Sequence, residues 1–125
     1  MNTKKLILKA IEAQKMAKAP YSQYPVGAAL LTTNNNVIMG CNIESKAYPT
    51  TLCAERVAIF SALAQGHTNF KALALITLDG AFPCGACRQI IYEYTDNITI
   101  YIATNKSEKF NTISIDELLP HPFGK

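Results

Sequence analysis

Two short stretches organise this sequence: Cys53-Ala54-Glu55 and Pro83-Cys84-Gly85-Ala86-Cys87. Cys84 and Cys87 stand three residues apart, so both sulfurs project from one face if a helix begins there. Cys53 can add a third thiolate from a second element, with Glu55 beside the metal but not bound to it. Three protein ligands leave the fourth position of a zinc ion open for water, as in catalytic zinc sites. The two stretches therefore predict an open catalytic zinc site.

Both stretches are expected at the start of a helix. The pattern predicts helices over about residues 52–65, with Thr51 as N-cap and Gly66 as the stop, and over about residues 84–94. The first N–H groups of a helix lack partners inside the helix, and the helix dipole there favours anions. Zinc binds deprotonated sulfur, so these positions favour the required thiolates.

The two arginines of the chain, Arg56 and Arg88, each lie directly beside one of the cysteine stretches. Three thiolates on Zn²⁺ leave a net charge of −1, which weakens the ion as a Lewis acid. We hypothesise that one or both arginines donate hydrogen bonds to the sulfurs and offset that charge. The alternative is that both are ordinary arginines on helix surfaces.

Glu55 is the candidate catalytic residue. It follows a cysteine ligand by two positions, so its carboxylate can reach a zinc-bound water whose pKa falls toward neutrality. It can then act as a general base and return the proton to the substrate. A glutamate in the first turn of a helix also complements the helix dipole, but the three cysteines favour catalysis.

The remaining elements alternate between helices and strands. The hydrophobic pattern predicts a helix over residues 3–18, strands over 26–33, 37–44, 71–78 and 98–103, turns at 34–36 and 79–80, and a last helix started by a capping box at 114–117. This order is typical of an α/β fold with helices on both faces of a mixed sheet. Two strand-helix-strand units imply parallel neighbouring strands with right-handed crossovers.

The predicted central helix is apolar on all sides. Between residues 57 and 65, only Ser61 and Gln65 are polar. One sheet in a small domain covers one side of a helix, so the other side is expected to pack against a partner subunit. The alternative is that alanines occur here because they favour helix formation.

Composition limits the class of protein. The 125 residues, 13.7 kDa, match one domain over 1–125, and 49% hydrophobic with 17% charged residues is typical of a folded globular protein. A net charge of +3 with scattered lysines gives no sign of a nucleic-acid partner. No apolar run is long enough for a membrane span or a signal peptide. A cytoplasmic protein with reduced cysteines is expected.

The motifs together resemble those of a known family. Cys53-Ala54-Glu55 followed by Pro83-Cys84-x-x-Cys87 resembles the zinc nucleoside and nucleobase deaminases. Pro83-Cys84-Gly85-Ala86-Cys87-Arg88-Gln89 is similar to the cytidine deaminases, and further matches lie at residues 19–22, 25–29, 42–44 and 47–48. Cys rather than His at position 53 resembles the small, homotetrameric, three-cysteine branch.

The resemblance implies a fold, a reaction and a ligand set. The fold is a three-layer α/β/α sandwich with a mixed sheet of about five strands. One Zn²⁺ per chain is bound by Cys53, Cys84 and Cys87, and zinc hydroxide attacks C4 of the cytosine ring. Glu55 shuttles the protons to N3 and to the departing ammonia. Cytidine and deoxycytidine become uridine and deoxyuridine, a hydrolase reaction of pyrimidine salvage.

The resemblance also implies the substrate contacts. Asn42 and Glu44, which share one face of a strand, hold the ribose hydroxyl. The aromatic ring of Tyr24 packs against the pyrimidine, and the backbone N–H of Ala54 meets the base carbonyl. Phe123 matches a C-terminal aromatic that reaches a neighbouring subunit's site, and Tyr48 lies at the same boundary. The segment 79–82 is shorter than in relatives, and Phe82 stands where a small or polar residue is common.

The fourth cysteine and the two histidines of the chain are expected to take no part in the zinc site. Cys41 lies on an apolar strand and is expected to be a packed thiol. His67 follows a helix-ending glycine and His121 lies between prolines, so both are expected at the surface and outside the site.

Four alternatives remain open at this stage. A structural zinc module would use Cys41 as a fourth ligand and close the site. A Cys-x-x-Cys redox protein would need neither Glu55 nor Cys53. A deaminase acting on RNA or DNA would need a basic stripe for phosphate contacts. An antibiotic-inactivating deaminase also carries a Cys-x-Glu site, but Asn42-Ile43-Glu44 favours a nucleoside.

Overall fold

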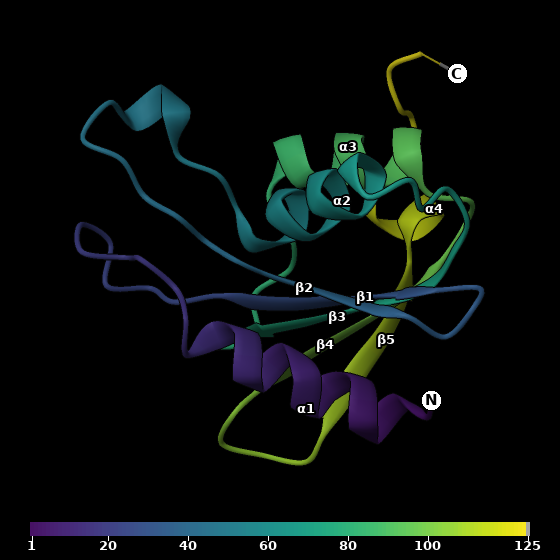
Figure 1. The fold of residues 1–125 in the computed structure, drawn as a ribbon, viewed down its shortest axis with the longest axis horizontal. Coiled ribbons are helices and arrows are strands. Elements are labelled where there is room, and N and C mark those ends of the chain that lie inside the picture. The colour runs from purple at the N-terminus through teal and green to yellow at the C-terminus, as the bar shows by residue number, and fades with distance from the viewer. Residues whose placement is uncertain (125) are drawn as a thin grey trace.

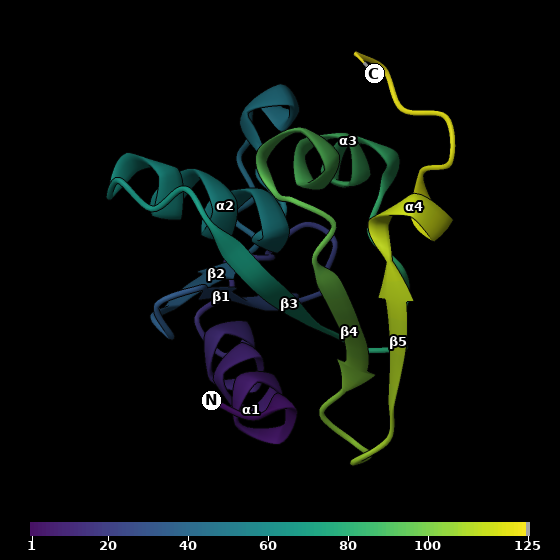
Figure 2. The same cartoon turned by 90° about the vertical axis from the view of Figure 1, so that its right-hand side faces the viewer.

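A computed structural model describes residues 1–124 of the chain as one mixed sheet between two layers of helices. The elements in order are α1 (Thr3–Gln14), β1 (Gly27–Thr32), β2 (Val37–Cys41), the 3-10 helix η1 (Tyr48–Thr50), α2 (Ala54–Ala64), β3 (Phe70–Thr77), α3 (Gly85–Tyr94), β4 (Thr99–Thr104), β5 (Phe110–Ser114) and α4 (Ile115–Leu118). Helix α1 covers one face of the sheet, and α2, α3 and α4 cover the other (Figure 1, and Figure 2 from the side). The predicted three-layer α/β/α sandwich is confirmed.

The five strands lie in the order β2-β1-β3-β4-β5. Strand β1 is antiparallel to both β2 and β3, β3 is parallel to β4, and β4 is antiparallel to β5. The sequence predicted parallel neighbours from both strand-helix-strand units, and this is wrong for the first unit. Strands β2 and β3 point the same way, but β1 lies between them, because the hairpin turn at Asn35, with a φ of 64°, folds β2 onto the outer side of β1.

Alternating side chains of the central strands build two separate cores. Toward α2 and α3, the strands point large residues, including Leu30, Leu73 and Ile100. Toward α1 they point mainly small ones, including Ala29 and Ala74. Small side chains let α1 lie close to the sheet, and both cores exclude water from apolar surface.

Two glycines permit the close approach of helices to strands. A Cβ at Gly27 would lie 2.1 Å from the Ala10 carbonyl oxygen of α1, and a Cβ at Gly40 would lie 2.5 Å from the Ala54 carbonyl oxygen of α2. Both distances are shorter than any normal contact. The second glycine therefore fixes how closely the start of α2, which carries Cys53, can approach β2.

Several element boundaries differ from the sequence-based expectation. The first helix ends at Gln14 rather than at residue 18, because Lys18 takes an extended conformation and pairs with Ile43. The amide of Lys18 donates to the Asn42 carbonyl at 2.9 Å, and the amide of Glu44 donates to the Lys18 carbonyl at 2.8 Å. Because Ile43 pairs with Lys18 and not with β1, β2 ends at Cys41 and not at residue 44, where the predicted strand ends.

Strand β5 was not predicted as an element. Its residues alternate poorly between apolar and polar, and most are exposed at the sheet edge. Backbone pairing with β4 holds it in place, and this pairing cannot be inferred from its side chains. The capping box that follows is confirmed, with the Ser114 hydroxyl accepting from the Glu117 amide at 3.2 Å.

Within residues 1–124, no helix is both long enough and apolar enough to span a membrane.

Candidate active site

The three cysteines of the motif meet where α2 and α3 begin. Cys53 is the N-cap residue of α2, Cys84 is the N-cap residue of α3, and Cys87 lies in the first turn of α3. Their three sulfurs all lie within 4.8 Å of one another, and the Sγ atoms of Cys53 and Cys84 are 3.9 Å apart. The predicted placement of the thiols at two helix starts is confirmed, although Thr51 is not the N-cap. Its hydroxyl instead accepts a hydrogen bond from the Ser45 amide.

The donor set fits zinc. With Zn–S bonds of about 2.3 Å, two sulfurs of a tetrahedral site lie about 3.8 Å apart, close to the spacing of Cys53 and Cys84. The pKa of Cys53 falls to about 5, because the Cys87 thiol donates a hydrogen bond to it and Arg56 lies beside it. The pKa of Cys87 is raised by that same hydrogen bond, by burial and by nearby negative charge. Three adjacent thiolates need a cation, and a divalent ion meets that need.

Arg56 is the arginine that contacts the thiols. Its Nη2 donates to the Sγ of Cys53 at 3.3 Å. Its pKa is raised by the same contact, so the guanidinium stays charged beside the sulfur. Its Nε is buried with no hydrogen-bond partner within residues 1–124. The hypothesis that one or both arginines donate to sulfur is therefore met by Arg56 within the described residues.

Arg88 donates hydrogen bonds to backbone carbonyls and not to a sulfur, unlike the contact that we hypothesised. Its Nε donates to the Pro83 carbonyl at 2.7 Å, and its Nη1 donates to the Leu118 carbonyl at 2.8 Å. It thus joins the segment just before Cys84 to the end of α4. This contact holds the ligand-bearing turn in place without touching a thiol.

Glu55 lies in the first turn of α2 and is only 4% exposed. Burial raises its pKa to about 7, and the charge of Cys53 adds to the shift. A carboxyl group with a pKa near neutrality can both take and give a proton. Its position and its environment both suit the predicted role of general base.

A cavity of about 380 Å³ opens directly beside the thiols. It is large enough for a nucleoside-sized molecule. Its walls come from the loop before β1, the segment after β2, the start of α2 with the residues just before it, the end of β3 and the turn before α3. The lining residues are Ser22, Tyr24, Val26, Asn42, Glu44, Thr51, Leu52, Cys53, Ala54, Glu55, Leu75, Thr77, Ala81, Phe82, Pro83 and Cys84.

Asn42 and Glu44 both line this cavity, and both also hold the loop before β1. The Asn42 side chain accepts from the Val26 amide and donates to the Tyr24 carbonyl, each at 2.9 Å. One Glu44 carboxylate oxygen accepts from the amides of Tyr21 and Ser22, and the other accepts from the Ser22 hydroxyl. The pKa of Glu44 is lowered chiefly by the Ser22 hydroxyl. These loop contacts were not foreseen from the sequence.

Tyr48 and Phe123 do not line the cavity of this chain. Tyr48 is 70% exposed and packs edge-on against Tyr21, with ring centroids 5.9 Å apart. In Figure 1 the η1 segment extends from the body of the molecule on the same side as the loop before β1. Phe123 is 83% exposed, and the Gln89 side chain both donates to its carbonyl and accepts from its amide.

The remaining cysteine and histidines lie outside the cluster. Cys41 is half-buried and is not among the three grouped thiols within the described residues. The closed four-cysteine zinc module therefore finds no support in this arrangement. His121 is exposed and His67 is partly exposed, as expected.

Thr77, which lines the cavity, and Asp79, in the turn that follows it, are residues that the sequence did not single out. The predicted turn at Asp79-Gly80 is present, and Gly80 has a positive φ of 76°. The carboxylate, however, accepts a hydrogen bond from Tyr24, which lies 55 positions earlier in the chain. Local sequence carries no signal for such a distant contact.

Comparisons with known proteins agree with this geometry. The family described as "Cytidine and deoxycytidylate deaminase zinc-binding region" matches residues 1–103. The cytidine deaminase of Sporosarcina psychrophila is 42% identical, with 100% of this chain and 93% of that protein covered. The cytidine deaminase of Halalkalibacterium halodurans is 41% identical, with 98% and 95% covered. The crystal structure of cytidine deaminase from Burkholderia pseudomallei has a TM-score of 0.94 at 38% identity and covers 98% of this chain and 100% of that chain.

A mixed sheet that brings three cysteines and a buried glutamate to two helix starts defines a zinc deaminase. The extent of the sequence match then fixes the family. This chain belongs to the cytidine and deoxycytidylate deaminase family.

Proposed function

We propose that this protein is a zinc-dependent hydrolase that converts cytidine and 2'-deoxycytidine to uridine and 2'-deoxyuridine. The observation that carries the proposal is the cluster of Cys53, Cys84 and Cys87 at the edge of a cavity of about 380 Å³ that also contains Glu55. The cytidine deaminases that are 41–42% identical over nearly the whole chain support the same substrate class.

Cys53, Cys84 and Cys87 would hold the zinc ion. When bound there, zinc supplies a Lewis acid that lowers the pKa of water toward neutrality. Arg56 offsets part of the thiolate charge through its hydrogen bond to Cys53. Arg88 does not contact a thiol but supports the zinc site indirectly, because its hydrogen bond to the Pro83 carbonyl holds the backbone just before Cys84.

Glu55 moves the protons of the reaction. Its carboxylate takes a proton from the attacking water and delivers it to N3 of the cytosine ring. As the C4–N bond breaks, the carboxylate takes the proton of the hydroxyl now on C4 and passes it to the amino group, which leaves as ammonia while C4 becomes a carbonyl. Its burial keeps bulk water away and brings its pKa close to neutral pH, which suits a group that must alternate between base and acid.

The sugar is held at the Asn42 and Glu44 side of the cavity. A carboxylate offers about four acceptor positions, and the loop contacts of Glu44 use three of them. The fourth is available for a ribose hydroxyl. The Asn42 amide nitrogen likewise has a second N–H beyond the one given to Tyr24. The base lies against the ring of Tyr24, with its carbonyl at the Ala54 amide.

The active form is proposed to be a homotetramer with its sites near subunit boundaries. Helix α2 exposes or partly exposes Val57, Phe60 and Ala64 on the side away from the sheet. Phe123 and Tyr48 are also exposed aromatic residues, suited to contact a neighbouring subunit's site. We further infer a single deaminase domain over residues 1–125 that acts in cytoplasmic pyrimidine salvage, where reduced cysteines persist.

The test is an ultraviolet assay of cytidine with the zinc-loaded protein and its Glu55→Gln variant. The variant should keep one zinc per chain and lose about 10²- to 10⁴-fold in kcat, the usual contribution of a general base. Glu12→Gln, on an exposed glutamate of α1, is the matched control and should retain full turnover. Unchanged turnover in zinc-loaded Glu55→Gln would refute the mechanism, and a wild-type protein inactive on both nucleosides would refute the function.

A further inference from the structure

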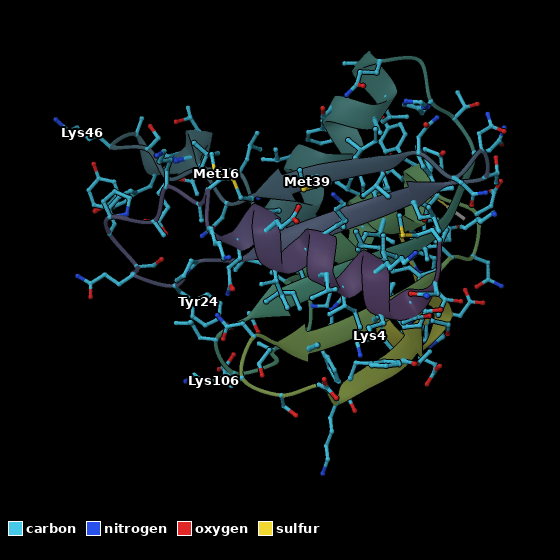
Figure 3. The ribbon with its side chains drawn as sticks, turned by 60° about the horizontal axis from the view of Figure 1, so that its bottom comes forward. Lys4, Met16, Tyr24, Met39, Lys46 and Lys106 are labelled. Carbon is cyan, nitrogen blue, oxygen red and sulfur yellow. The ribbon has the colours of Figure 1, made fainter. Side chains whose placement is uncertain are left out.

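One hydrogen bond joins two walls of the cavity. The Tyr24 hydroxyl donates to the Asp79 carboxylate at 2.5 Å. Tyr24 belongs to the loop before β1, whereas Asp79 belongs to the turn after β3. Figure 3 shows Tyr24 at one end of the molecule, past the C-terminal end of α1. A side-chain hydrogen bond thus joins the two segments that flank the cavity.

The Asp79 carboxylate is itself held by its own turn. It accepts from the Ala81 amide at 3.2 Å, and the Thr77 hydroxyl lies 3.5 Å away. The Thr77 hydroxyl oxygen accepts from the amides of Gly80 and Ala81, at 2.7 and 3.0 Å. Gly80, with a φ of 76°, allows the chain to turn here. Asp79 is therefore a fixed acceptor and not a freely moving surface carboxylate.

We propose that Asp79 is a positioning residue for substrate binding, because it holds the ring of Tyr24 in the cavity wall. The proposal rests on the proposed function, since it concerns the same cavity. Tyr24 is partly exposed, so packing alone leaves its ring room to turn toward solvent. A ring already held in place loses less freedom when a flat base packs against it. The contact thus acts on binding rather than on proton transfer.

The electrostatics of the pair agree with a formed hydrogen bond. The pKa of Tyr24 is raised, first by burial and then by its bond to Asp79. The pKa of Asp79 is lowered, chiefly because the Tyr24 hydroxyl stabilises the carboxylate. Both shifts keep the phenol protonated and the carboxylate charged at neutral pH, which is the pairing that the contact requires.

The kinetic test compares Tyr24→Phe, Asp79→Ala, Asp79→Asn and the double variant Tyr24→Phe/Asp79→Ala in the zinc-loaded protein. Tyr24→Phe and Asp79→Ala should each raise KM for cytidine by about two- to tenfold, the range that one ordinary hydrogen bond allows, with kcat within about twofold. The double variant should be no worse than Tyr24→Phe alone. Asp79→Asn, which keeps an acceptor oxygen, should recover part of the loss. Tyr94→Phe removes an exposed hydroxyl outside the cavity and serves as the matched control.

A second measurement needs no substrate. With ¹³Cζ-labelled tyrosine, the Tyr24 resonance is the one that Tyr24→Phe removes. In Asp79→Ala this resonance should move toward the position of exposed tyrosines at pH 7, and in Tyr94→Phe it should stay in place. Because this result does not depend on turnover, it separates failure of the proposal from failure of the proposed function.

Two results would overturn the role of Asp79. One is an additive KM effect in the double variant, which would mean that the two side chains act independently. The other is a Tyr24 resonance that Asp79→Ala and Asp79→Asn both leave unchanged. A variant that lowers kcat as strongly as it raises KM would also count against positioning, since it would indicate disturbance of the turn before Cys84.

Discussion

At the scale of single residues, the site depends on how charge is distributed around Cys53. The pKa of this thiol is lowered because the adjacent Cys87 thiol and the Arg56 guanidinium both stabilise its thiolate, whereas the pKa of Cys87 is raised. Cys87 must ionise beside an existing negative charge, which is unfavourable without a cation. Zinc affinity and the position of Arg56 are therefore linked.

Removal of the Arg56 guanidinium should weaken zinc binding. We expect Arg56→Ala to lower zinc affinity by about 10- to 100-fold, the usual effect of losing a partner of a metal ligand. The measurement is competition with a chromophoric chelator at fixed pH. Arg88→Ala is the matched control, because among residues 1–124 Arg88 donates to the Pro83 and Leu118 carbonyls and to no thiol. It should lower Tm and change zinc affinity far less, and equal effects of the two variants on affinity would contradict the assignment.

Glu44 should make a pH-dependent contribution to stability. Its pKa in the folded protein is lowered below its ordinary value of 4.5, chiefly by the Ser22 hydroxyl. A lowered pKa stabilises the fold above the ordinary value, and this stabilisation is lost as pH falls through the folded value. The Tm of wild type should therefore exceed that of Glu44→Gln at pH 6, and the gap should close toward pH 3. A gap that is constant with pH would show that the charge is not responsible.

At the scale of elements, the position of α2 on the sheet fixes the site. Cys53 and Glu55 lie at the start of α2, and the close approach of that helix to β2 depends on the missing side chain of Gly40. A side chain at position 40 would push the start of α2 away from β2. Packing at the sheet thus controls the geometry of the thiols.

Gly40→Ala tests this control. The new methyl group would lie within 2.5 Å of the backbone of both Ala54 and Ala58, so α2 must shift. We expect a loss of about 1–3 kcal/mol in the free energy of unfolding, as for other overpacked sites, and weaker zinc binding. Denaturant unfolding measures the first quantity and chelator competition the second.

Gly85→Ala is the control for stability, since nothing lies within 4 Å of the added Cβ. It should leave the free energy of unfolding nearly unchanged. If Gly40→Ala were equally harmless, the close packing of α2 on β2 would not be a constraint on this fold.

At the scale of the whole molecule, the outer side of α2 leaves apolar side chains exposed in the single chain. Phe60 is 37% exposed in the single chain and lies on the same helix as the partly exposed Val57. A helix that is apolar on all sides is normally buried on all sides. The proposed homotetramer would cover them.

A charge on this face should disrupt the assembly. We expect wild type to sediment as an oligomer at micromolar concentration and Phe60→Lys to sediment as smaller species, because a lysine cannot be buried there without a partner. Leu8→Lys, at a 52% exposed position on α1, is the matched control and should sediment like wild type. A monomeric wild type would remove the proposal that α2 is a subunit interface.

The layer order and most elements could be predicted because local patterns are strong where strands are buried on both faces. All six residues of β1 are buried, as are all residues of β3 except Lys71, and such runs are easily recognised. The edge strand β5 was missed, since its exposed residues need no such pattern. The pairing of β1 between β2 and β3 was also missed, because neighbours in a sheet depend on contacts between distant segments.

The sequence by itself determined the chemistry of this protein. The spacing of three cysteines and a glutamate at two helix starts is enough to predict a zinc site, an open ligand position and a general base, because ligand type and local geometry are encoded within a few residues. Tertiary structure decided which side chains complete the site. That Arg56 and not Arg88 donates to a thiol, and that Asp79 holds Tyr24, depends on segments brought together by the sheet. Such contacts form only when packing fixes distances between residues that are far apart in the chain.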